Sequence, residues 1–386
     1  MNFELTEEQE MLRAAAREFA EGEIVPIAYQ IDATEMIPDS LRKKLRENNF
    51  FSLLIPRDYG GVEVDAISYV LVMEELSRAS AAVGITISVH NSVAAGPISM
   101  FGSAEQKAKW LPLLAERLLG AFALTEPGSG SDSAALSTRA VANDGCYVLD
   151  GAKTFVTNGN YADLFVLMAR TSQELKHRGI TAFLVERKSP GLKIGKTLEK
   201  MGIRGSDTVE LTLERCCVPA ENRLSEEGRG FRVAMQTLDG GRIGVAAQAL
   251  GIAQAALDAA VRYARERVQF GKPISEFQAI QWMIADMKAQ IEGARLLTLR
   301  AAWLKDQGLP HGPEASIAKL IASAAAREVT DRAVQIHGGY GYTKEFAVER
   351  YYRDAKVTEL YEGTSEIQRI VIANSLLHPK DTKRAP

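Results

Sequence analysis

Tyr147-Val148-Leu149-Asp150-Gly151 and Thr154-Phe155-Val156-Thr157 differ from the segments before them because their side chains follow a period of two, as in a β-strand. Similar short stretches follow at Leu164 to Ala169, Thr181 to Glu186 and Val209 to Glu214, with Gly, Asn, Asp and Pro between them. Strands this closely spaced, without helices between them, indicate an antiparallel sheet or a small barrel. A parallel dinucleotide-binding fold, in which strands alternate with helices, is not expected.

Helical patterns flank this central segment on both sides. From Thr6 to about Arg117 the apolar residues recur at helical spacing. After Gly230, the patterns at Val245 to Arg265, Gln278 to Lys305 and Glu314 to Ile336 are long enough for the helices of a bundle. A chain of 386 residues suggests two or three domains. We therefore predict a mainly α fold with a central β-domain: an N-terminal helical domain over residues 1–118, a middle antiparallel β-barrel or sheet domain over 119–229, and a C-terminal four-helix-bundle domain over 230–386.

Composition and charge are those of an ordinary soluble globular chain. It has 46% hydrophobic and 25% charged residues and a net charge of -3, so binding to nucleic acid is not expected. The three cysteines and five histidines lack the spacing of metal ligands or of a disulfide framework, which predicts no metal site and a reducing compartment. The acidic N-terminus and the lack of long apolar runs predict a cytoplasmic protein, or a processed mitochondrial-matrix form, with no membrane span. Residues 380–386 are expected to be disordered.

The stretch Glu359-Leu360-Tyr361-Glu362-Gly363-Thr364-Ser365-Glu366-Ile367-Gln368-Arg369 combines one acid, one glycine and the start of a helix. Ser365 and Gln368 have the spacing of a capping box, with Ser365 as the N-cap. Such a loop can hold Glu362 as a general base beside exposed backbone N–H groups, which suit an anionic ligand such as a pyrophosphate. Taken alone, Glu362 is more commonly explained as a solvated acid that complements the helix dipole.

Two segments of the central domain could contact a ligand. In Thr125-Glu126-Pro127-Gly128-Ser129-Gly130-Ser131-Asp132, glycines and hydroxyl residues let the backbone approach a ligand closely. The segment fails as a Rossmann fingerprint, so NAD is not predicted. Phe155 and Thr157 share one face of a strand, where they could stack on and hydrogen-bond to a flat heteroaromatic ring. A flexible surface turn and plain sheet residues remain the alternative interpretations.

A further candidate lies in the helical C-terminal part. Arg265, Arg267, Gln269, Phe270 and Gln278 surround the turn Gly271-Lys272-Pro273. The arginines could meet phosphates, or they could complement a helix dipole. Gln335-Ile336-His337-Gly338-Gly339 is either a helix C-terminus with a glycine stop or backbone that approaches a ligand.

The order of these motifs along the chain resembles that of the flavin-dependent acyl-CoA dehydrogenases. The resemblance covers nearly the whole chain and is carried by five motifs, which are Ala123-Leu124-Thr125-Glu126-Pro127-Gly128-Ser129-Gly130-Ser131-Asp132, Lys200-Met201-Gly202-Ile203-Arg204-Gly205-Ser206, Arg267-Val268-Gln269-Phe270-Gly271, Gln335-Ile336-His337-Gly338-Gly339 and Tyr361-Glu362-Gly363-Thr364. The stretch Met235-Gln236-Thr237-Leu238-Asp239-Gly240-Gly241-Arg242-Ile243-Gly244 looks most like the short-chain, butyryl-CoA type.

The resemblance implies a flavoprotein oxidoreductase of fatty acid β-oxidation that converts an acyl-CoA to a trans-2-enoyl-CoA. Glu362 would abstract the α-proton while the β-hydrogen leaves as hydride to N5 of FAD. The backbone N–H of Glu362 and a ribityl hydroxyl of the flavin would hold the thioester oxygen. Electrons would pass to an electron-transfer flavoprotein, and the protein would be at least a dimer and commonly a dimer of dimers. Because an α-proton is a very weak acid, the site must raise the pKa of the base and stabilise the enolate.

The resemblance also assigns residues to the two ligands. Those expected to line FAD are Phe122, Ala123, Leu124, Thr125, Ser131, Phe155, Val156, Thr157, Thr364, Ser365 and Glu366. Those expected to reach the FAD of a neighbouring subunit are Arg267, Phe270, Gln278, Gln335, Ile336, His337, Gly338 and Gly339. Those expected to meet the substrate are Ser131, Asp239, Gly240, Gly241, Arg242 and Gly363.

Three positions depart from patterns found in parts of the family. Phe155 stands where many relatives have tryptophan, so the flavin face stays aromatic but lacks the indole N–H. Some relatives place the base near Gly241, and glycine cannot take a proton, which leaves Glu362. The lack of an arginine near Gly84 argues against a carboxylated acyl tail. A medium-chain or branched-chain dehydrogenase, an oxidase, and a catalytically idle acyl-CoA-binding relative remain as alternatives.

Overall fold

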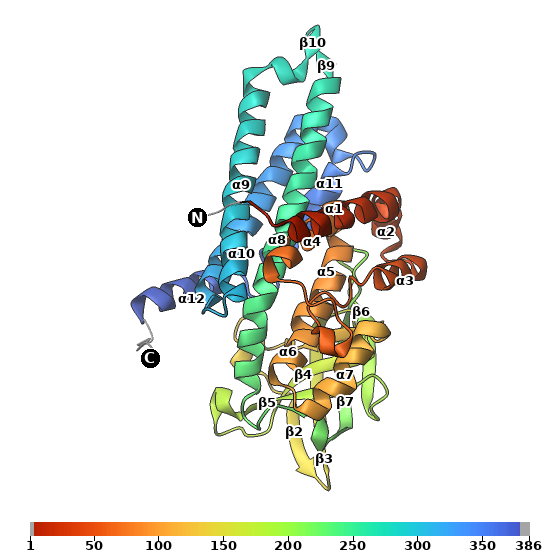
Figure 1. Ribbon diagram of the computed structural model, residues 1–386, viewed down its shortest axis with the longest axis vertical. Helices are drawn as coiled ribbons and strands as arrows, with labels where there is room; N and C mark the ends of the chain where they lie inside the picture. The colour runs from red at the N-terminus through yellow and green to blue at the C-terminus, as the bar shows by residue number, and fades with distance from the viewer. Residues whose placement is uncertain (1–3, 379–386) are drawn as a thin grey trace.

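The structure is a computed structural model that describes residues 4–378 (Figure 1). Its N-terminal part is built from helices that lie across the middle of the molecule. They are α1 (Glu7–Phe19), α2 (Ala28–Thr34), α3 (Asp39–Glu47), α4 (Ala66–Ala79), α5 (Ala81–Ser88), the π-helical turn η4 (Val89–Ala95), α6 (Gly96–Phe101) and α7 (Ala104–Glu116). A capping box formed by Thr6 and Gln9 starts α1. The tail over residues 380–386, for which disorder is expected, lies outside the described residues.

The central part is a sheet at one end of the molecule. Its strands are β1 (Gly120–Ala123), β2 (Arg139–Asn143), β3 (Cys146–Thr157), β4 (Leu164–Arg170), β5 (Ile180–Glu186), β6 (Leu192–Thr197), β7 (Thr208–Pro219) and β8 (Arg223–Leu224). They run in the order β6-β7-β3-β2-β4-β5-β8, with β1 beside β4. Most pairings are antiparallel, but β1 and β2 each pair with β4 in parallel. The predicted central β-domain between helical parts is confirmed.

Both faces of β4 and β5 are covered, which explains their nearly continuous apolar runs. Leu164, Val166 and Met168 join a cluster with Trp110 of α7. Phe165 and Leu167 join a second cluster, on the other face of β4. The sheet is therefore fixed to the N-terminal helices through one face of its middle strands.

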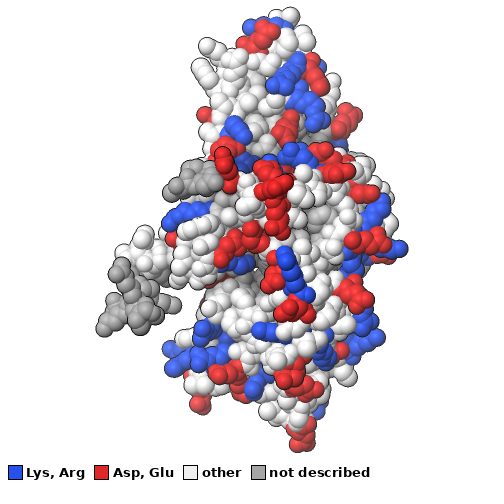
Figure 2. Space-filling view, viewed as in Figure 1, with Lys and Arg blue, Asp and Glu red and all other residues white. Residues whose placement is uncertain are grey.

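Long helices form the C-terminal part, which rises to the far end of the molecule (Figure 1). They are α8 (Gly230–Glu266), α9 (Gln278–Asp306), α10 (Gly312–His337), α11 (Val348–Val357) and α12 (Ser365–Leu377), and the hairpin of β9 (Val268–Gln269) and β10 (Lys272–Pro273) connects α8 to α9. Acidic and basic side chains alternate over the face in Figure 2 without a large region of one sign, which agrees with a net charge of -3.

Two helical stretches correct the expectation about apolar length. Residues 81–101 and 230–266 are long and apolar enough to cross a membrane by length and composition alone. In the folded chain 94% and 83% of their apolar windows are buried inside the protein. Their apolar character is accounted for by the core, because a helix surrounded by other helices is apolar on all sides.

A close approach of α4 to α8 holds the N-terminal helices on the bundle. A Cβ atom added to Gly251 of α8 would lie 2.4 Å from the carbonyl oxygen of Glu74 and 2.8 Å from the amide nitrogen of Arg78, both in the backbone of α4. Backbone cannot move as a flexible side chain can, so Gly251 sets the distance between these helices. Gly293 of α9, by contrast, has nothing within 4 Å of an added Cβ atom.

This contrast gives a matched pair of substitutions. Gly251→Ala should lower stability, because overpacking costs about 1–3 kcal/mol and exceeds the helix-propensity gain of roughly 1 kcal/mol. Gly293→Ala should raise stability by about 0.5–1 kcal/mol. Thermal unfolding of the FAD-loaded protein measures both, and a Gly251→Ala variant that gains stability as Gly293→Ala does would contradict the close packing.

Candidate active site

A strained turn before α12 carries Glu362. Both Glu362 and Gly363 have positive φ angles, +52° and +94°, a region in which a residue other than glycine is rarely found. Thr364 is the N-cap of α12, and its hydroxyl accepts a hydrogen bond from the amide of Ile367. The prediction of Ser365 as the N-cap is therefore wrong. Gln368, expected to complete a capping box, is buried and instead donates from Nε2 to the carbonyl oxygen of Gly363 at 2.8 Å.

The carboxylate of Glu362 lies against the backbone of α8. A Cβ atom added to Gly241 would lie 2.1 Å from Oε2 of Glu362 and 3.2 Å from the side chain of Val93. Oε2 is buried, and no residue among 4–378 hydrogen-bonds to it. Burial raises the pKa of Glu362 to about 7, against the opposing effect of Lys319 and Arg242. An unpartnered carboxylate with this pKa can accept a proton near neutral pH.

The residues expected to contact substrate on α8 surround this carboxylate. Arg242 is buried, and its Nη1 donates to Oδ1 of Asp239 at 2.7 Å and to the hydroxyl of Ser316 at 3.4 Å. Burial raises the pKa of the Asp239 carboxyl group, and Arg242 opposes that rise. Gly241 and Arg242 thus lie beside Glu362, whereas Ser131 is exposed in the loop after β1.

A buried ion pair fixes the loop that follows β1. Nζ of Lys153 lies 2.7 Å from Oε1 of Glu126 and donates to the carbonyl oxygen of Leu124 at 3.1 Å. Glu126 also accepts hydrogen bonds from the amides of Ser137 and Thr138. Burial alone would raise the pKa of Glu126, but Lys153 and these donors lower it to about 2. The carboxylate therefore stays ionised and holds both ends of the loop.

The residues at this loop fit a flat, polar-edged cofactor such as FAD. The amide of Thr154 donates to the carbonyl oxygen of Thr125, which places the β1 loop beside β3. At the next residue β3 changes register, and Phe155, at φ +56°, leaves its ring 66% exposed. β3 is thus one bulged strand where two strands were predicted. An exposed aromatic face next to the hydroxyls of Thr125 and Thr157 can stack on a ring and hydrogen-bond to its edge.

The π-helical turn η4 brings this loop and Glu362 into one neighbourhood. Val93 of η4 lies against Gly241, while Ala94 and His90 lie against Gly120 at the start of β1. His90 is buried, and its Nδ1 accepts a hydrogen bond from the amide of Gly120 at 3.0 Å, as expected for an interior histidine. Glu362 and β1 therefore face η4 from two sides.

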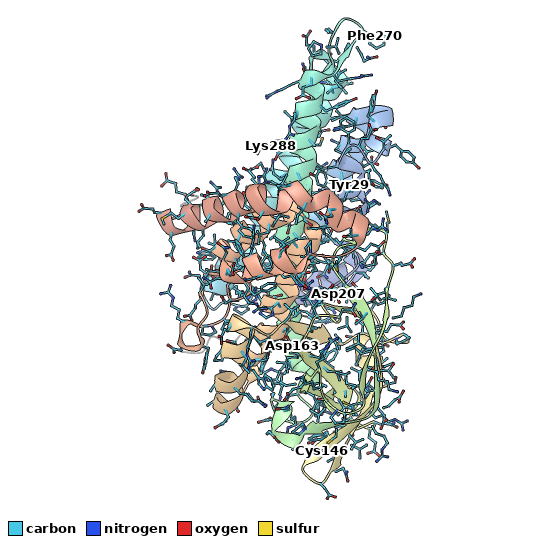
Figure 3. The ribbon with its side chains drawn as sticks, turned by 90° about the vertical axis from the view of Figure 1, so that its right-hand side faces the viewer. Tyr29, Cys146, Asp163, Asp207, Phe270 and Lys288 are labelled. Carbon is cyan, nitrogen blue, oxygen red and sulfur yellow. The ribbon has the colours of Figure 1, made fainter. Side chains whose placement is uncertain are left out.

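A second cluster of predicted residues lies at the far end of α8 and α10. A hollow of about 600 Å³ is lined by residues that include Arg267, Phe270 and 336–339, whereas Gln278 and Gln335 do not line it. His337 stacks on Tyr263 with ring centroids 4.2 Å apart. Phe270 is 94% exposed at the tip of the molecule, as Figure 3 shows. The structure thus divides the predicted cofactor residues between two clusters.

The motifs did not identify Lys319 or the partnership of Glu126 with Lys153. Lys319 is fully buried on α10, on the face it shares with Ala315, Ala318 and Ala322. A lysine within an alanine stripe at helical spacing is a signal that could have singled it out. Among residues 4–378 no group of three or more His, Cys, Asp or Glu side chains could hold a metal ion.

Comparisons with known proteins cover almost the entire chain. Residues 6–117, 121–216 and 228–377 match the N-terminal, middle and C-terminal domains of the family described as acyl-CoA dehydrogenase. The short-chain specific acyl-CoA dehydrogenase of Mus musculus mitochondria is 50% identical over 97% of this chain and 91% of its own length.

Solved structures agree with this match. Butyryl-CoA dehydrogenase from Megasphaera elsdenii is 47% identical, covers 98% of this chain and 100% of its own, and superimposes with a TM-score of 0.96. A structure of PigA with FAD and proline is 30% identical, covers 97% of this chain and 99% of its own, and gives a TM-score of 0.94.

The Glu126–Lys153 pair predicts a large stability effect. Lys153→Met leaves the Glu126 carboxylate buried without its cation and should cost about 3–5 kcal/mol. The deficit should shrink as the pH falls, because protonation of Glu126 removes the uncompensated charge. Lys193→Met is the control: the Lys193–Glu214 pair has side chains 62% and 59% exposed, and its loss should cost at most about 1 kcal/mol. Equal losses in urea unfolding would contradict the proposed role of the pair.

Proposed function

The chain belongs to the acyl-CoA dehydrogenase family of FAD-dependent oxidoreductases, and we propose that it dehydrogenates short-chain acyl-CoA thioesters with Glu362 as the base. The single observation that supports this role best is the Oε2 atom of Glu362, which is buried without a hydrogen-bond partner among residues 4–378. An unpartnered carboxylate oxygen is free to meet a ligand. An acyl-CoA places its α-carbon against it.

The chemistry requires a base that is ionised at working pH and still basic. A free glutamate, with a pKa of about 4.3, would be too weak a base. The pKa of about 7 for Glu362 lets about half of the molecules hold an ionised base at neutral pH. The turn with positive φ angles places the carboxylate of Glu362 against Gly241 of α8. Glu362 would take the α-proton on a carboxylate oxygen, and its backbone N–H would hold the thioester oxygen.

FAD would be held by the side chains of Phe155, Thr125 and Thr157 and by the backbone from Phe122 to Leu124. Ser131 and residues 364–366 would lie at its edges. Bound FAD supplies the acceptor for the β-hydrogen and its electron pair. The cation Arg242, next to the base, would stabilise the negative charge of the developing enolate. We further propose that Asp239, Gly240 and Gly363 contact the substrate.

Packing along α8 supports a short acyl tail. One turn beyond Gly241, a Cβ atom on Gly244 would lie 2.6 Å from the hydroxyl of Ser88 and 3.4 Å from that of Tyr69. One turn further, Gln248 is buried, accepts a hydrogen bond from the hydroxyl of Tyr361 and donates to the carbonyl oxygen of Ala81. These side chains occupy the same helix face within roughly 10 Å of Gly241. A tail directed along this face soon meets hydrogen-bonded side chains.

We propose that the distal cluster completes the cofactor site of a second subunit. The cluster offers an aromatic surface at the exposed Phe270, a cation at Arg267, and backbone amides at 336–339 for a pyrophosphate and its nucleoside. Gln278 and Gln335, which do not line the hollow, would join them from the start of α9 and the end of α10. A dimer is then the smallest complete unit, and a dimer of dimers follows the family's common form. Electrons would pass to an electron-transfer flavoprotein, in the cytoplasm or, for a processed form, in the mitochondrial matrix.

Glu362→Gln tests the base directly. The amide keeps the shape of the side chain but cannot take a proton at neutral pH, so the variant should keep FAD and bind butyryl-CoA yet lose flavin bleaching by about 10³-fold or more, in line with the loss of a general base. Anaerobic stopped-flow absorbance measures the bleaching. Glu47→Gln, which alters an exposed carboxylate paired with Lys43 on α3, should bleach at the normal rate. A Glu362→Gln variant that bleaches normally would refute the assignment.

The acyl-length proposal has its own test. Bleaching rates for a series of straight-chain acyl-CoA substrates should be highest for butyryl-CoA and should fall for octanoyl-CoA, because the longer tail meets Tyr69, Ser88 and Gln248. Gln248→Ala should raise the octanoyl-CoA rate relative to that of butyryl-CoA by removing the hydrogen-bonded barrier. An unchanged ratio in a folded Gln248→Ala variant would place the acyl tail elsewhere.

A further inference from the structure

Lys319 on α10 is a cation in the core of the helical bundle. Its side chain is fully buried. Among residues 4–378 it forms no ion pair with a carboxylate within 4.0 Å, unlike Lys153, whose ammonium group meets Glu126 at 2.7 Å. Its Nζ donates a hydrogen bond to the carbonyl oxygen of Gly363. A buried ammonium group is costly unless its charge and its protons are compensated, so this contact calls for a reason beyond packing.

The acceptor of Lys319 lies in the turn that carries Glu362. The carbonyl oxygen of Gly363 receives two donors from two helices, Nζ of Lys319 from α10 and Nε2 of Gln368 from α12, and Gln368 also reaches the carbonyl oxygen of Glu362 at 3.3 Å. Glu362 is held at a positive φ angle, which costs a residue other than glycine conformational energy that surrounding contacts must offset, whereas Gly363 adopts its positive φ freely. The two donors hold the turn in the conformation that points the Glu362 carboxylate at Gly241.

The charge of Lys319 also acts on that carboxylate. Lys319 has the largest effect of any single charged group on Glu362, ahead of Arg242 of α8, and both favour the ionised form. Arg242 already bonds to Asp239. Lys319 faces Glu362, Arg242, Glu359 and Glu366, and Glu362 in turn faces the hydroxyls of Tyr69 on α4 and Tyr361. Burial lowers the pKa of Lys319 to about 8, so the group still carries most of its charge at pH 7.

From this geometry we infer that Lys319 is the positioning residue of the base: it fixes the turn at Gly363 and places an otherwise unpaired positive charge behind Glu362. The inference rests on the proposed role of Glu362. Lys319 does not touch the substrate, and it acts through the carbonyl group it holds and the field it sets. Without it, burial would leave Glu362 protonated over more of the neutral pH range.

The pH profile of flavin reduction separates these two contributions. In the native protein the rate of bleaching by butyryl-CoA should rise with pH through about 7, because the base works only when ionised. Lys319→Met removes the donor and the charge, so the midpoint should move up by roughly one to two pH units and the plateau rate should fall as the turn loosens. Lys319→Gln keeps a donor without the charge, so its midpoint should move up while its plateau recovers in part.

Lys305→Met is the matched control. Lys305 is a half-buried lysine of α9 with a pKa lowered by burial, and Asp306 is its charged neighbour; it is not among the charges that act on Glu362. Its removal should leave the midpoint in place. A folded, FAD-loaded Lys319→Met or Lys319→Gln protein with the native midpoint would overturn the inference. If Lys319→Met does not fold, Lys319→Gln alone decides.

The outcome is distinguishable from a failure of the proposed base. If the Glu362→Gln variant bleaches normally, the assignment of Glu362 as the base is refuted, whatever the Lys319 variants show. If the Glu362→Gln variant is inactive and the Lys319 variants keep the native midpoint, only the positioning role of Lys319 is refuted. Flavin absorbance at 450 nm as a check of loading and circular dichroism as a check of folding accompany every variant.

Discussion

The packing of one carboxylate against one glycine sets the geometry of the candidate site. Oε2 of Glu362 occupies the space that a Cβ atom on Gly241 would need, so a larger residue there would displace the carboxylate from its present position. Glycine at this position weakens the interior of α8 by roughly 1 kcal/mol relative to alanine. The same contact requires the turn before α12 to adopt positive φ at two successive residues. Oε2 of this carboxylate is buried and has no hydrogen-bond donor among residues 4–378, and burial raises the pKa of Glu362.

Residues from all three parts of the fold keep that carboxylate close to the loop after β1. The turn η4 lies between Glu362 and β1, with Val93 facing α8 and His90 facing β1. Asn158, buried just after β3, donates to the carbonyl oxygens of Thr86 on α5 and Gly120 on β1. The sheet is therefore hydrogen-bonded directly to the N-terminal helices. Relative motion of the sheet and the bundle would break buried hydrogen bonds, which cost about 1–3 kcal/mol each when left unmade.

Periodicity alone predicted the order of helices and strands and the long helices α8, α9 and α10, because each carries many repeats of its own pattern. Glu362 and the β1 loop were found through motifs that combine an acid, glycines and hydroxyl residues. Local rules failed where tertiary contacts override them. Thr364 caps α12 because Gln368 is drawn inward to the carbonyl of Gly363. Phe155 interrupts β3 with a bulge that no local pattern announces, and Lys319 was passed over because a single sequence does not show what a buried cation meets.

The two buried lysines show how pairing separates structural from functional charge. Lys153 meets a full carboxylate, and Glu126 is satisfied further by backbone amides, so the pair neutralises itself and serves the shape of a loop. Lys319 meets only a carbonyl oxygen, so its charge is not cancelled by an adjacent anion and extends to the nearest ionisable group, Glu362. In a low-dielectric core such a field is weakly screened. A buried charge that forms no ion pair can therefore change the pKa of a nearby carboxyl group without contacting the substrate. This role accounts for a lysine within the alanine face of α10.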